Sequence, residues 1–178
     1  MPNLPALTSV QTRPALAYAG DDGANSIIRS YINENASAID AALPVARGTA
    51  TSTTKGAETC KPWAADTDDF LGISKRTVLK DVSQSSQSVT YARYDAVPVI
   101  CEGEAWVYIA EDVRGGDQVL ILTAGAAVQT TAFGSSKGGV AGSGRVAIPW
   151  KYAGNGTYAS GSLVKIEGLS ASTGRTTT

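Results

Sequence analysis

The densest alternation of apolar and polar positions runs over residues 96–122, AVPVICEGEAWVYIAEDVRGGDQVLIL. Successive side chains of an extended chain point to opposite faces, so apolar residues at every second position are typical of a strand with one buried face. The alternation is interrupted at Glu102-Gly103-Glu104 and at Gly115-Gly116-Asp117, where glycine and aspartate favour turns. This stretch therefore predicts a β-meander at the centre of a small all-β domain, with core anchors at Val99, Cys101, Trp106, Tyr108 and Val119.

Further short strands are expected on both sides of the meander. Before it, valine-, threonine- and aromatic-containing runs lie at 45–54, 58–63, 70–74 and 89–94. After it, a Gly/Ser-rich excursion at 133–144 precedes runs at 145–152 and 162–167, with a turn signal at Asn155-Gly156 between them. The pattern predicts a mainly β chain, a small β-barrel or β-sandwich over residues 45–169.

A different periodicity occurs over residues 25–43. Asn25 or Ser26 is a suitable N-cap, Pro44 ends the segment, and apolar residues recur near helical spacing at Ile28, Tyr31, Ile32, Ile39 and Leu43. We therefore expect one N-terminal amphipathic α-helix. Its apolar stripe either covers the β domain of its own chain or contacts another chain, and both alternatives stay open.

The two ends of the chain show neither the alternation of a strand nor the spacing of a helix. Residues 1–24 contain prolines that disfavour helix, and their few apolar side chains are scattered. They predict an extended N-terminal arm that is either disordered or docked on a neighbouring subunit. Residues 170–178 are expected to be a flexible C-terminal tail. The interface expected for the arm and helix comprises Leu4, Leu7, Val10, Leu16, Tyr18, Ile28, Tyr31, Ile32 and Ile39.

Length and charge narrow the class of protein. A chain of 178 residues with 43% apolar residues has enough apolar content to bury a core without a disulfide or a metal. Fifteen Lys and Arg nearly balance sixteen Asp and Glu, which argues against nucleic acid or an anionic membrane as a partner. No apolar run approaches the ~20 residues of a membrane span, and the first residues do not resemble an export signal. We expect the protein to be made, and kept or assembled, in the cytoplasm.

The chain contains no histidine, which excludes Ser-His-Asp and Cys-His catalysis and histidine-based zinc sites. Cys60 and Cys101 lack the spacing of a metal pair, and we expect reduced core residues, with a disulfide left open. The sequence thus predicts no catalytic residue, no metal site and no cofactor.

Three local patterns imitate functional sites. The glycines at 138–144 lack the ending of a phosphate loop, so a surface loop is expected. Glu102 and Glu104 form a carboxylate pair without other features of a sugar-cleaving site. Aspartates in the loop at 66–69 lack the glycine and the distal glutamate of a calcium loop. We interpret all three as structural or solvated.

The order of several short motifs resembles bacteriophage structural cement or decoration proteins. The resemblance covers residues 45–169 and rests on Val45-Ala46-Arg47-Gly48-Thr49, Cys60-Lys61-Pro62, Phe70-Leu71-Gly72-Ile73, Tyr94-Asp95-x-Val97-x-Val99, Gly103-x-Ala105-Trp106-Val107, Gly116-Asp117-x-Val119 and Gly161-Ser162-Leu163-Val164-Lys165-Ile166. The arm, the expected helix and the 133–144 excursion are not part of it.

The resemblance implies a non-catalytic protein on the outer surface of the virion capsid, assembled in the host cytoplasm, that stabilises junctions between capsomers. Its implied partners are the major capsid protein and other copies of itself, as a homotrimer or a dimer. Two alternatives stay open: a tail or fibre module that binds a receptor or glycan through Trp63, Trp106 or Trp150, and a carboxylate-dependent hydrolase that uses Glu102 or Glu104.

Overall fold

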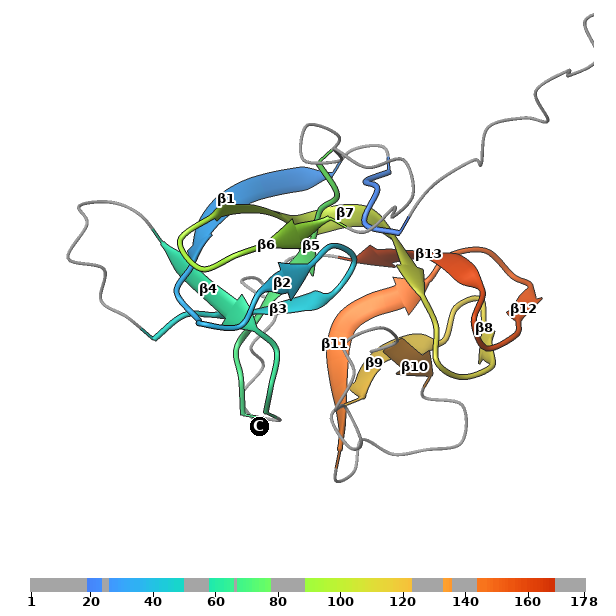
Figure 1. Ribbon diagram of the computed structural model, residues 1–178. Helices are drawn as coiled ribbons and strands as arrows, with labels where there is room; N and C mark the ends of the chain where they lie inside the picture. The colour runs from blue at the N-terminus through green and yellow to red at the C-terminus, as the bar shows by residue number, and fades with distance from the viewer. Residues whose placement is uncertain are drawn as a thin grey trace, which may run out of the picture.

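The computed structural model describes residues 19–23, 26–49, 58–65, 67–77, 89–122, 133–135 and 144–168. Every regular element in these ranges is a strand, which confirms the mainly β class (Figure 1). The strands are β1 (Ile27–Asn33), β2 (Ile39–Asp40), β3 (Pro44–Arg47), β4 (Thr59–Pro62), β5 (Phe70–Ser74), β6 (Thr90–Tyr91), β7 (Ala96–Tyr108), β8 (Val113–Arg114), β9 (Gln118–Leu122), β10 (Phe133–Ser135), β11 (Arg145–Tyr152), β12 (Thr157–Tyr158) and β13 (Leu163–Gly168).

The first half of the chain forms a closed sheet that we call the first barrel. Its strands follow the order β1-β4-β3-β5-β7, and β7 pairs with β1 again to close the circle. All neighbours are antiparallel except β1 and β4, which are parallel. The short β2–β6 pair belongs to the same half. The interior contains Tyr31, Ile39, Val45, Cys60, Leu71, Val89, Tyr91, Val97, Val99 and Cys101.

The second half forms a second barrel around the C-terminal part of β7. Here the order is β7-β13-β11-β9-β10, and a parallel bridge between Ile109 and Phe133 brings β10 back to the end of β7. The short β8–β12 pair lies in this half. The core combines small aliphatic side chains with buried aromatic ones, among them Ala105, Val107, Val119, Ile121, Phe133, Ile148, Trp150, Tyr152 and Ile166.

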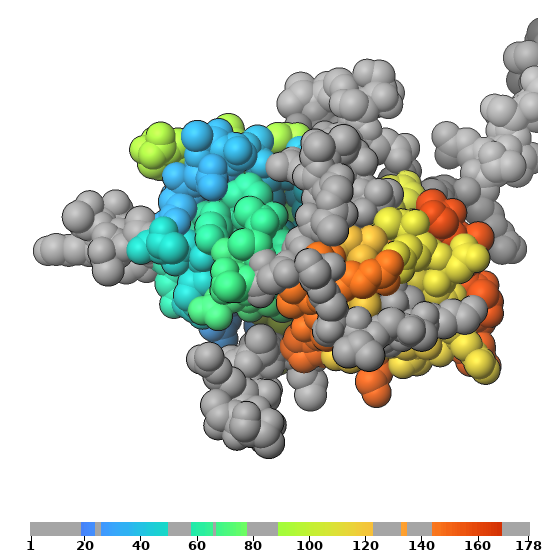
Figure 2. Space-filling view, turned by 90° about the horizontal axis from the view of Figure 1, so that it is seen from below, coloured from blue at the N-terminus to red at the C-terminus, as the bar shows by residue number. Residues whose placement is uncertain are grey.

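Strand β7 belongs to both barrels. It runs without interruption for 13 residues, so the turn expected at Glu102-Gly103-Glu104 is instead a bend within one strand. Gly103 has φ +97°, a conformation that favours glycine. Ile73 and Ile100, from β5 and β7, pack into the core cluster of the second barrel, so the two halves share apolar contacts. Figure 2 shows them as two lobes side by side.

The helix expected over residues 25–43 is not observed, and that prediction is wrong. Residues 27–33 are strand β1, which pairs with β7 along Ile27–Ile32 and with β4 at its C-terminal end. Isoleucine and tyrosine are good strand formers, and long-range pairing outweighs a weak local helical period. The Asn33 amide ends the strand, because its Oδ1 accepts from the Asn35 N–H and its Nδ2 donates to the Ser37 carbonyl.

Other strand predictions agree more closely with the structure. The bounds expected at 70–74 and 145–152 match β5 and β11, and 162–167 nearly matches β13. The first predicted strand is shorter, ending at Arg47, and residues 50–54 of that prediction lie outside the described residues. The tail expected at 170–178 also lies outside them.

Two of the expected core anchors face outward. Val99, Cys101 and Val119 are buried, but Tyr108 is 44% exposed and Trp106 is only half-buried. The inner face of this part of β7 is formed by Ala105, Val107 and Ile109. Because a strand alternates strictly, burying these three places the intervening aromatic residues on the opposite face.

Candidate functional site

The N-terminal residues of the described chain lie along the bend of β7. The Gly20 N–H donates to the Trp106 carbonyl at 2.8 Å, and the Trp106 N–H donates to the Asp21 carbonyl at 3.0 Å. An antiparallel bridge joins Asp22 to Ala105. We call residues 19–23, together with Ser26, the clasp. Of the arm expected over residues 1–24, residues 20–23 therefore bond to the sheet, and residues 1–18 lie outside the described residues.

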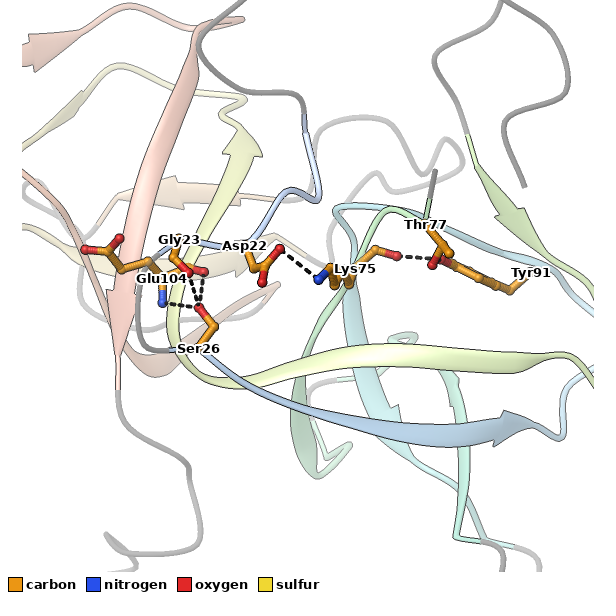
Figure 3. Close-up of polar contacts among 7 residues, drawn as sticks. All are labelled: Asp22, Gly23, Ser26, Lys75, Thr77, Tyr91 and Glu104. Carbon is orange, nitrogen blue, oxygen red and sulfur yellow. Dashed lines mark hydrogen bonds and ion pairs between the residues drawn. The ribbon is translucent and has the colours of Figure 1, made fainter. Parts of the chain in front are cut away.

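The Ser26 hydroxyl holds the end of the clasp. Its Oγ accepts from the Glu104 N–H at 3.1 Å, and its O–H lies 2.9 Å from the Glu104 carbonyl and 3.2 Å from the Gly23 carbonyl (Figure 3). The Gly23 N–H also donates to the Glu104 carbonyl at 2.9 Å. These bonds satisfy the backbone of β7 at the bend and fix the point where β1 begins.

The clasp is also bonded to the end of β5. Lys75 Nζ lies 2.8 Å from Asp22 Oδ1, and the Arg76 N–H donates to the Gly20 carbonyl at 2.8 Å. Behind it, the Tyr91 hydroxyl donates to the Lys75 carbonyl at 2.5 Å (Figure 3). Burial raises the pKa of Tyr91, although a hydrogen bond with Thr77 opposes the shift, so this phenol stays protonated and able to donate.

The close approach at Gly20 requires glycine. Its φ is +83°, and a Cβ there would lie 3.0 Å from the backbone nitrogens of both Ala42 and Arg76. On the other side of the bend, Lys165 Nζ pairs with Glu104 Oε1 at 2.8 Å. The clasp therefore joins the end of β5, the turn after β2 and the bend of β7.

The residues expected to form an interface are divided by the structure. Leu4, Leu7, Val10, Leu16 and Tyr18 lie outside the described residues. Tyr31 and Ile39 are 3% and 1% exposed, inside the first barrel, so assigning them to an interface was wrong. Ile32 is half-buried. Only Ile28 is exposed, at 37%, and Ile27 beside it is 44% exposed.

Sequence reasoning missed three exposed side chains, those of Ile27, Arg93 and Tyr94. Two adjacent isoleucines in a strand cannot both face one core, and this was the available signal for Ile27. Tyr94 is 69% exposed in a turn with φ +70°, and the Arg93 guanidinium lies 4.7 Å from its ring centroid. No pattern in the sequence marked that turn as an exposed aromatic site.

The candidate carboxylates are engaged in structural contacts. Glu104 forms the ion pair with Lys165. Burial alone would raise the pKa of Asp68, but the Lys61 ammonium at 2.6 Å and the N–H groups of Ala64 and Ala65 lower it below its ordinary value. Asp66 lies outside the described residues. Within the described ranges, no group of three or more His, Cys, Asp or Glu side chains is placed to hold a metal ion.

Both cysteines are free and buried in the first barrel, which confirms the expectation of reduced core residues. Burial, with a smaller contribution from Glu34, raises the pKa of Cys60 to about 12. Burial also raises the pKa of Cys101, whose Sγ lies 3.8 Å from the Tyr31 hydroxyl. Neither thiol is suited to nucleophilic chemistry. No helix in the described part of the chain is long and apolar enough to cross a membrane.

Comparison with known proteins identifies the family of the chain. A family model described as "Structural cement protein (E217 gp24/Pam3 gp6)" matches residues 6–168. A solved chain from "The capsid of Myoviridae Phage XM1" has a similar fold, with a TM-score of 0.59 at 16% identity, covering 90% of this chain and 94% of that chain. No curated protein matches significantly. Because the family match includes both barrels and the clasp, the chain belongs to the phage structural cement protein family.

Proposed function

We propose that this protein binds the outer surface of a phage head, over junctions between capsomers, and stabilises the shell without catalysis. The observation that carries the proposal is membership of the structural cement family over residues 6–168. The fold likeness to a chain of a phage capsid is consistent with it. Two barrels joined through one strand and a shared core suit a rigid clip rather than an enzyme that opens and closes.

The stabilising mechanism is mass action. A protein that binds the assembled shell, but not its separated parts, shifts the equilibrium toward the shell. A clip that spans two capsomers gains further affinity, because its second contact forms at high effective concentration. The near-neutral net charge of −1 lets many copies lie side by side with little repulsion.

The partners we propose are the major capsid protein and other copies of this chain. Among the described residues, the exposed large apolar side chains available for such contacts are those of Ile27, Ile28, Tyr94 and Tyr108. A homotrimer fits a local threefold axis of a shell and a dimer fits a twofold axis. We propose the homotrimer, with the dimer as the alternative.

The arm preceding the clasp extends the reach of each copy. Eighteen residues precede Ala19, and an extended chain of that length spans about 60 Å. A compact domain formed by a chain of this size is only about 40 Å across. We therefore propose that the arm, rather than a helix, makes the contacts between subunits.

Deletion of residues 2–18 tests this function while keeping the clasp intact. We expect the truncated protein to melt as a folded β domain, but to occupy fewer sites on heads and to protect them less against heat. A matched control deletes residues 170–178, at the other end of the chain. Unchanged occupancy and heat protection after the arm deletion would refute the role of the arm. Failure of the full chain to bind heads would refute the function itself.

A further inference from the structure

Among the residues that the structure describes, strand β1 is fully paired along only one of its two edges. On one side it pairs with β7 from Ile27 to Ile32. On the other side, β4 pairs with β1 only at Ile32 and Asn33. The first four residues of β1 are all exposed. The first barrel is therefore closed at one end of β1, whereas the other end of this strand presents an open edge.

The hydrogen-bond pattern identifies which backbone groups face this open edge. The Asn33 N–H donates to the Asp95 carbonyl on the β7 side, and the Ile32 N–H donates to the Glu58 carbonyl on the β4 side, both at 3.0 Å. Because the direction alternates along a strand, the backbone groups of Ile28 and Ser30 face the β4 side. Within the described residues, β4 does not extend far enough to pair with either of them.

An edge of this kind is a template for another strand. Unpaired N–H and C=O groups beside exposed isoleucine side chains favour the addition of an extended segment, and proteins normally block such edges. Ile27 and Ile28 are 44% and 37% exposed, so an added strand would also cover apolar surface. The open edge of β1 therefore has the features of a binding site for an extended peptide.

We propose that the open edge of β1 binds residues 7–13 of the arm of a second copy as an added strand. This inference rests on the proposed function, in which copies lie side by side on a head. It assigns the arm a specific receiving site on its neighbour, at Ile28 and Ser30.

The arm segment has the composition that strand addition requires. Residues 7–13 read LTSVQTR and lie between Pro5 and Pro14, each of which interrupts pairing. Thr8, Val10 and Thr12 are β-branched residues at alternate positions, the pattern of one face of a strand. Seven residues span about 23 Å, enough to cover the open part of β1 and its apolar side chains.

The position of the clasp favours the arm of a second copy over the arm of the same chain. The clasp and β1 pair with the same edge of β7, at 104–106 and 96–102 respectively, so residues 20–23 and residues 27–33 lie one after the other along that edge. An arm that paired with its own β1 would have to reverse before Ala19 and cross to the far side of that strand. An arm from a neighbour approaches the edge without this reversal.

A cysteine pair in the full chain tests the contact on decorated heads. We expect Val10→Cys combined with Ser30→Cys to form a disulfide between copies, seen as dimers or longer species on non-reducing gels. The native thiols are buried and do not compete. The control pairs Val10→Cys with Thr157→Cys, which is exposed in the second barrel. A disulfide within one chain, or a yield no higher than that of the control, would overturn the proposal.

A proline at the edge provides an independent test. Ser30→Pro removes an N–H that faces the open side but leaves the bonds to β7, whereas Ser30→Ala keeps that N–H. We expect Ser30→Pro to weaken head binding on the order of tenfold and Ser30→Ala to leave it unchanged. In the protein lacking residues 2–18, Ser30→Pro should have no further effect. An equal loss in that background would overturn the proposal, whereas failure of the unmodified chain to bind heads would contradict only the proposed function.

Discussion

The first barrel and the second barrel are built on the same strand, β7, yet they are closed by different interactions. The second barrel has a continuous apolar core around Trp150, which is fully buried. The first barrel contains two buried polar side chains, Asn33 and Ser74, which bond to the backbone of neighbouring segments. Within the described part of the chain, its closing strand, β1, is paired on one side only over most of its length.

From this difference we infer different roles for the two halves. An apolar core packed from many strands is stable and rigid, whereas polar contacts and an open strand edge provide places where another chain can bind. The clasp also lies next to β1 along β7. We infer that the second barrel supplies stability and that the first barrel carries the contacts between copies.

The largest effect on stability is expected from substituting one of two tryptophans. Trp150→Ala should lower the free energy of unfolding by about 3 to 5 kcal/mol, because it leaves a large cavity in the second barrel. Trp106→Ala should cost only about 1 to 2 kcal/mol, since this side chain is half-buried on the outer face of β7. Denaturant unfolding measures both. Equal losses would mean that Trp106 is a core residue and that the assignment of faces is wrong.

A smaller effect is expected in the first barrel, at Asn33. Its Nδ2 donates to the Tyr91 carbonyl at 3.1 Å, and the residue is fully buried. Asn33→Ala should cost about 1 to 3 kcal/mol, because buried backbone groups lose their partners. Asn35→Ala, in the adjacent exposed loop, is the matched control and should cost less. If the two substitutions have the same effect on the melting temperature, the buried amide does not hold the barrel together.

The smallest expected effect is on the pH dependence of stability, through Asp68. Because the pKa of Asp68 in the folded protein lies below its ordinary value of 3.8, its contribution to stability is present above that value and is lost as the pH falls through the folded pKa. We expect about 1 kcal/mol at most for the Lys61 pair. Asp68→Asn should therefore destabilise the protein at neutral pH, and this difference should begin to shrink below pH 3.8 and vanish once the pH is under the folded pKa. A difference that persists in strong acid would contradict this explanation.

Local patterns in the sequence were sufficient to predict most strands in the second half of the molecule. The strands at Arg145–Tyr152 and Leu163–Gly168 alternate clearly and end at turn residues, so their existence follows from local chemistry. The same alternation predicted strand at 96–108, but it could not show that Gly103 bends one strand instead of separating two. That choice depends on β13, which pairs along the whole C-terminal part of β7.

The first barrel was harder to predict because its structure depends on distant segments. Residues 27–33 have a spacing compatible with helix, and their pairing with residues 96–102 and with β4 makes them a strand. The same error placed Tyr31 and Ile39 at an interface. The open edge has no local signal at all, since it exists because β4 begins to pair with β1 only at Ile32.

The most direct test of the cement function is the copy number and heat stability of heads with and without this protein. We expect the full chain to bind at hundreds of copies per particle and to raise the temperature at which the shell opens. Binding of only a few copies at the tail, or a shell that opens at the same temperature in both preparations, would contradict the central claim.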